Sequence, residues 1–88
     1  MNALLQVIAE NMARDSLRWM DIQKQLQDAS ENGPWMLLPD EVADLWGEMT
    51  RLDGELRRRV SAINVSYDPS VARAILDEVY SIVYDGVT

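Results

Sequence analysis

Cysteine and histidine are both absent from this chain of 88 residues. Their absence removes the thiolate nucleophile, every disulfide, the usual base at neutral pH and the ligands of most zinc and copper sites. Long hydrophobic runs are absent too, because the longest uninterrupted one is the four residues from Trp35 to Leu38, against the ~20 that cross a bilayer. We therefore expect neither an enzyme nor a membrane protein, and no cofactor.

Positive charge is scarce as well: eight Lys and Arg stand against fifteen Asp and Glu, so the net charge is −7. This charge repels nucleic-acid backbones and anionic lipids and attracts basic partners. The apolar content of 48% is typical of a packed domain, and the length allows one domain, residues 1–88. Because no basic residue precedes the apolar segment 1–9, we expect no signal peptide and a cytoplasmic protein.

Apolar residues recur at steps of three and four in three segments, which is typical of helices with one buried face. The first helix is predicted at about 3–30. The second is predicted at about 39–63 and the third at about 69–84, opened by Pro39 and Pro69. Since no segment alternates apolar and polar residues as a half-buried strand does, the predicted fold class is all-α.

The apolar seams of the two longer segments match if the chain turns back on itself. An antiparallel hairpin would place residues whose numbers sum to about 68 opposite each other. The third segment has a broader apolar stripe, so we expect it to pack into the groove between the first two or against another chain. The predicted architecture is a three-helix bundle that binds a partner or a second copy. The matched pairs are Leu26 with Val42, Trp19 with Met49, Met12 with Leu56, and Leu5 with Ile63.

Two seam positions are polar, Asp15 and Arg59. In the predicted register Arg59 lies opposite residue 9, about six residues or ~9 Å from Asp15, so the two are not evident partners. A buried unpaired charge costs several kcal/mol, and a second chain would satisfy both. We therefore expect both residues at an interface; alternatively, Asp15 fixes the register and Arg59 extends its head into solvent.

The apolar stretch from Trp35 to Leu38 lies in the connection between the first two predicted helices. It either covers the end of the bundle or binds a partner, because Trp and Met are frequent in protein interfaces. Tyrosines of the third helix add further contact surface. The predicted partner-binding residues are Trp35, Met36, Leu37, Leu38, Tyr80 and Tyr84.

Our first hypothesis is a non-catalytic protein–protein interaction module, such as a chaperone, an adaptor or a subunit of an assembly. It is based on the missing catalytic groups and on apolar faces that are generous for 88 residues. The alternative is an acidic inhibitor that blocks a basic nucleic-acid-binding surface of a target, because residues 1–44 carry a charge of −5 and residues 45–88 one of −2. Neither hypothesis involves a metal, a cofactor, a membrane or direct binding of nucleic acid.

The triplet Asp15-Ser16-Leu17 resembles the acyl carrier proteins, in which the serine carries phosphopantetheine. Asp40-Glu41 after Leu38-Pro39 also resembles the segment after the second helix of that family. The resemblance implies an acyl-carrying role for Ser16. The family places a helix and a long loop before its serine, whereas only fourteen residues precede Asp15 and they continue the same helical pattern. Ser16 is therefore expected in mid-helix, and this function is the most distant alternative.

Overall fold

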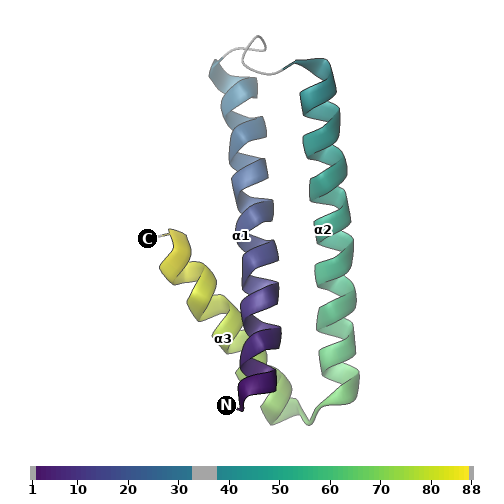
Figure 1. The fold of residues 1–88 in the computed structure, drawn as a ribbon, viewed down its shortest axis with the longest axis vertical. Helices are drawn as coiled ribbons and strands as arrows, with labels where there is room; N and C mark the ends of the chain where they lie inside the picture. The colour runs from purple at the N-terminus through teal and green to yellow at the C-terminus, as the bar shows by residue number, and fades with distance from the viewer. Residues whose placement is uncertain (1, 33–37, 88) are drawn as a thin grey trace.

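A computed structural model describes residues 2–32 and 38–87, and these form three α-helices (Figure 1). They are α1 (Ala3–Asn32), α2 (Pro39–Ser66) and α3 (Pro69–Val87). The predicted all-α fold of three packed helices is confirmed. Each helix begins at the predicted residue and ends two or three residues later than the predicted 30, 63 and 84.

Local side chains explain where the helices start and stop. Asn2 Oδ1 accepts a hydrogen bond from the Leu5 N–H at 2.9 Å, so it caps α1. Pro39 stands in the first turn of α2, where its missing N–H is not needed. Tyr67 is extended, with φ −123° and ψ 156°, and the next residue, Asp68, precedes a proline, a position that disfavours helical backbone. Because nothing breaks the helix earlier, α2 continues to Ser66.

The three helices are arranged around α1. Helices α1 and α2 lie side by side as a long antiparallel hairpin, and α3 turns back along α1 and diverges from α2 (Figure 1). The last turn of α3 reaches the middle of α1, where Gly86 lies against Leu17. The expectation that the third helix fills the groove between the first two is therefore wrong for most of its length, because α3 packs chiefly on α1 and touches α2 only sparingly.

The main core lies in the half of the molecule where all three helices meet. Side chains of α1, α2 and α3 form one buried cluster there, with exposed fractions of at most 4%. In the other half, of the described helices only α1 and α2 are present, and the buried residues are fewer. The protein thus has a three-helix half and a two-helix half. The buried cluster is Ala9, Met12, Ile63, Ala72 and Ile75.

Candidate functional site

The predicted partner-binding residues separate into two groups. Trp35, Met36 and Leu37 lie outside the described residues, whereas Leu38 precedes α2 and is 64% exposed. Tyr80 and Tyr84 lie on α3 with 73% and 58% of their surface exposed. Tyr80 and Tyr84 are thus two large amphipathic side chains exposed on α3. Leu38 belongs to a different part of the chain, just before α2.

Two adjoining hollows of about 320 and 370 Å³ lie along the hairpin, mostly in the two-helix half, and share Trp19. Together we call them the hairpin groove. On α1 the lining residues recur every three or four positions, so they lie on one helical face. Its lining is Ser16, Trp19, Met20, Gln23, Leu26, Gln27 and Ser30 from α1, with Trp46, Met49, Asp53 and Leu56 from α2.

The chemistry of the hairpin groove is apolar with uncharged polar edges. Trp46 is 53% exposed and Met20 is 37% exposed, and both are residue types enriched at binding surfaces. Asp53 is the one charged residue among the lining residues, and its Oδ2 accepts from Nε of Arg57 at 3.0 Å. A concave surface with exposed Trp and Met and little charge can bind an apolar surface of another molecule without burying unpaired charges.

Sequence reasoning did not identify this groove. Trp19, Leu26 and Met49 were assigned to the seam between the first two helices, and Trp46 and Met20 were not assigned a role. A signal was available, because Trp46 is a large apolar residue that stands outside the seam of the second helix. It makes the apolar face of α2 wider than a two-helix seam needs.

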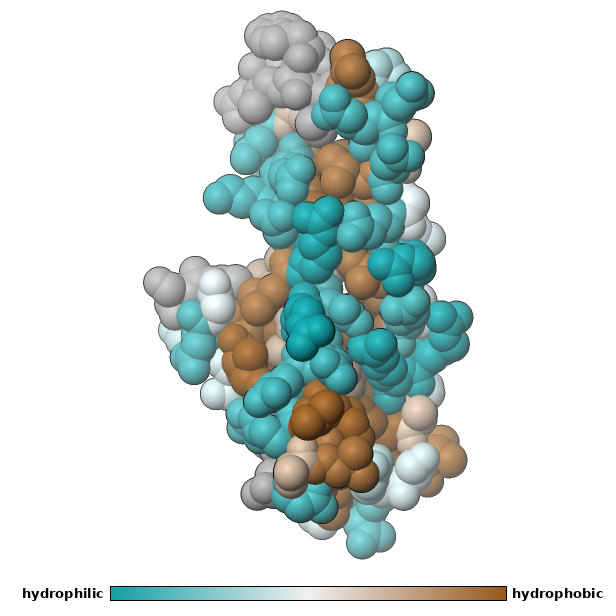
Figure 2. Space-filling view, in the orientation of Figure 1, coloured by the Kyte–Doolittle hydropathy of each residue, from teal (hydrophilic) through white to brown (hydrophobic). Residues whose placement is uncertain are grey.

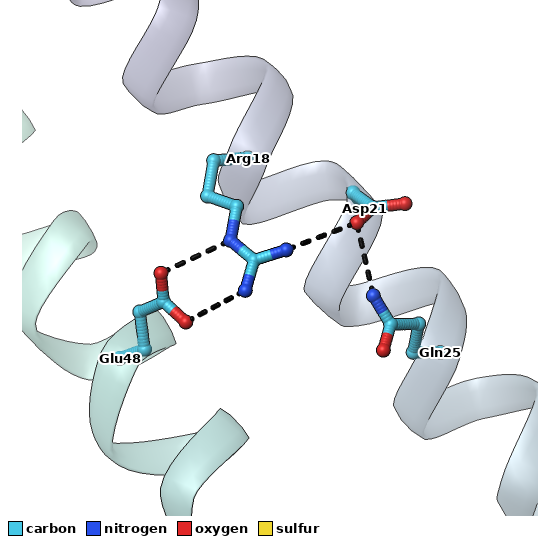
Figure 3. A network of polar contacts seen from close by, with 4 residues as sticks. All are labelled: Arg18, Asp21, Gln25 and Glu48. Carbon is cyan, nitrogen blue, oxygen red and sulfur yellow. Dashed lines mark hydrogen bonds and ion pairs between the residues drawn. The ribbon is translucent and has the colours of Figure 1, made fainter.

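A polar network connects the two helices of the hairpin (Figure 3). Arg18 of α1 donates from Nε and Nη2 to the two carboxylate oxygens of Glu48 on α2, at 3.0 and 2.9 Å. Its Nη1 donates to Asp21 at 3.2 Å, and Gln25 donates to the same Asp21 oxygen at 2.9 Å. The hydrogen bond from Arg18 lowers the pKa of Glu48, and the positive charges of Arg18 and Arg51 lower it further. This bidentate contact favours the register in which Arg18 lies opposite Glu48.

Asp15 and Arg59 do form a pair within the monomer. Arg59 Nη1 lies 2.6 Å from Asp15 Oδ2, and the side chains are 42% and 24% exposed, respectively. The expectation that they lack partners in one hairpin was wrong, because it compared backbone positions and ignored the reach of the long arginine side chain. Since neither charge is buried without a partner, this pair gives no reason to expect a second chain.

A further hollow of about 400 Å³ lies where the hairpin meets the start of α3, and Arg59 contributes to its wall beside Asn11 and Tyr67. Arg59 already pairs with Asp15, and the adjacent Ser66 is the last residue of α2, where the helix dipole is negative. This hollow is therefore a poor binding site for an anion. The surface also carries an apolar patch, brown in Figure 2, toward the lower end of the molecule in that view. Among the exposed apolar side chains of α1, Leu4 and Val7 are 65% and 50% exposed.

The described part of the chain also bears on three other functions, namely metal binding, membrane spanning and acyl carriage. No group of three or more Asp and Glu side chains there is placed to hold a metal ion, and none of its helices is long and apolar enough to cross a membrane. Ser16 lies in the middle of α1, and its hydroxyl donates to the Met12 carbonyl oxygen at 2.9 Å. Comparison with models of known families, with curated proteins and with solved structures gives no match to this chain.

Proposed function

We propose that this chain is a non-catalytic protein–protein interaction module that binds its partner in the hairpin groove. The observation that supports it most is the exposure of Trp46, 53% of whose surface faces solvent beside the hollow it helps to form. Burial of an aromatic side chain of this size is a strong source of binding free energy. The groove lies mostly in the half of the hairpin that α3 leaves uncovered.

The groove is favoured over the other apolar surfaces because it is concave and contains two tryptophans. Leu4 and Val7 are also exposed, but aliphatic side chains are less frequent among the residues that dominate interface energies. Tyr80 and Tyr84 extend the available contact surface on α3.

A pulldown from lysate of the source cells tests the proposal, with the intact chain as bait. Trp46→Gln and Met20→Gln together remove apolar groove surface without adding charge, and we expect them to abolish capture of the main bound proteins. Val65→Gln is the matched control, because Val65 is 87% exposed on the same helix α2 and does not line the groove. Capture that survives the groove changes, or that is lost equally with Val65→Gln, contradicts the proposal.

The acidic inhibitor of a basic nucleic-acid-binding surface is the second candidate. It is favoured by Asp40, Glu41 and Asp44, which are exposed on the first turns of α2. Such contacts are screened by salt, whereas apolar contacts are not. Capture that disappears at about 0.5 M salt, where the screening length is below ~8 Å, and that persists in the groove variants supports the inhibitor instead of the groove.

A further inference from the structure

We infer that the partner's element in the hairpin groove is a single amphipathic helix whose apolar stripe is flanked by lysine or arginine side chains. This inference rests on the proposed function and names the chemistry of the occupant. The shape of the groove supports the helix, and the charge of the surrounding half supports the basic flanks.

The groove has the form that a helix needs. It lies between two antiparallel helices, and its lining on α1 extends from Ser16 to Ser30, which is about 21 Å at 1.5 Å per residue. A helix of about 14 residues covers this length. In the three-helix half, α3 already packs Ala72 and Ile75 against α1 and α2. A partner helix would extend the same kind of packing into the two-helix half.

The net charge of the half that contains the groove favours a basic occupant over a second copy. The described residues of the two-helix half, 17–32 and 38–52, contain seven acidic and three basic residues. Two such halves would repel each other, whereas lysine or arginine flanks on a helix seated in the groove would be attracted. The edges of the groove do not repel a basic helix, since Gln23 and Gln27 are uncharged and can accept hydrogen bonds from cationic donors. The acidic residues are Asp21, Asp28, Glu31, Asp40, Glu41, Asp44 and Glu48, and the basic ones are Arg18, Lys24 and Arg51.

Two synthetic peptides of about 18 residues test the inference, a length that gives roughly five helical turns. Both carry the same leucine stripe at helical spacing; one has lysine and the other glutamate at the remaining positions. Binding to the intact chain is measured by calorimetry and tryptophan fluorescence at about 0.15 M salt. We expect the lysine peptide to bind at least about tenfold more tightly than the glutamate peptide, because several flanking charges act together.

The groove variants locate the bound peptide. We expect Trp46→Gln with Met20→Gln to weaken binding of the lysine peptide at least about tenfold, and Val65→Gln to leave it unchanged. Circular dichroism of each variant shows whether the fold is kept. Equal affinity for both peptides overturns the basic flanks, and lysine-peptide binding that is insensitive to the groove variants overturns the site. A dimer in sedimentation that Trp46→Gln dissociates identifies a second copy as the occupant and overturns the inference.

The outcomes separate this inference from the proposed function. If neither peptide binds in the groove but the pulldown still depends on Trp46 and Met20, the groove binds protein and the occupant is of another kind. If the pulldown is independent of both residues, the proposed function itself fails.

Discussion

Substitution of Gly47 or Gly54 by alanine should have the most clearly predictable effect on the free energy of unfolding. Both lie inside α2, and a Cβ atom built on either would meet nothing within 4 Å. Glycine in a helix interior is about 1 kcal/mol less favourable than alanine, because it loses more backbone entropy on folding. Gly47→Ala and Gly54→Ala should therefore each raise the free energy of unfolding by about 1 kcal/mol.

The double variant sharpens this prediction. The two glycines are seven residues apart on α2, about 10 Å along the helix, so their effects should add to about 2 kcal/mol. For a domain of this size, 1 kcal/mol shifts Tm by about 4–8 °C, so the double variant should melt roughly 8–16 °C higher. Thermal and urea unfolding followed by far-ultraviolet circular dichroism measure both quantities.

Gly86→Ala provides the matched contrast. A Cβ at Gly86 would lie 2.9 Å from Cδ1 of Leu17, where α3 meets α1, so part of the helical gain is lost to displacement of that side chain. We expect a smaller gain than at Gly47 or Gly54, or a net loss. If Gly47→Ala and Gly54→Ala leave stability unchanged or lower it, the reasoning is refuted, and the outer face of α2 must contact something that an added methyl group disturbs.

Three further outcomes are expected from the core and the ion pairs. Ile75→Ala, which empties a fully buried position, should lower the free energy of unfolding by about 2–5 kcal/mol in urea titration; a loss below about 1 kcal/mol would contradict its core position. Because the pKa of Glu48 is lowered in the folded state by Arg18, its ionised form stabilises the protein above its unfolded pKa, and this contribution is lost as the pH falls through the folded pKa. The stability difference between Glu48→Gln and the unaltered chain should therefore be present at neutral pH, shrink as the pH falls below the ordinary glutamate pKa of about 4.3, and vanish only below the lowered folded pKa. A difference that stays constant as the pH falls would contradict the pairing. Asp15→Ala should lower stability by no more than about 1 kcal/mol, since its pair with Arg59 is partly exposed, and should leave the oligomeric state in sedimentation unchanged.

The sequence was sufficient to predict where each helix begins. Pro39 and Pro69 stand in the first turns of α2 and α3, and a proline signal is local, so it needs no knowledge of the rest of the fold. The helix ends were less predictable. The apolar pattern of α2 was taken to finish at Ile63, yet α2 continues to Ser66, because helical backbone persists until a residue disfavours it.

The extra apolar residue Trp46 can be read from the sequence, but the groove itself cannot, because whether it stays uncovered depends on the direction of α3. Trp19 and Met49 have the spacing of seam residues whether or not a third helix covers them. The apolar stripe of α3 is broad enough to fit the hairpin groove or one side of α1, and only tertiary packing selects the second. The Asp15–Arg59 pair was missed for a related reason, since register fixes backbone positions and not the end of a long side chain.

The ending of α3 beside Leu17 has a consequence for local unfolding. Beyond that point, among residues 2–32 and 38–87, the hairpin is held by the α1–α2 interface alone, whereas Met12 and Ile75 lie in a cluster to which all three helices contribute. Opening of the two-helix half therefore exposes fewer buried side chains than global unfolding does. Amide hydrogens near Ile22 and Leu45 should exchange with solvent through these smaller openings, and a partner in the hairpin groove would slow that exchange by selecting the closed hairpin from the ensemble.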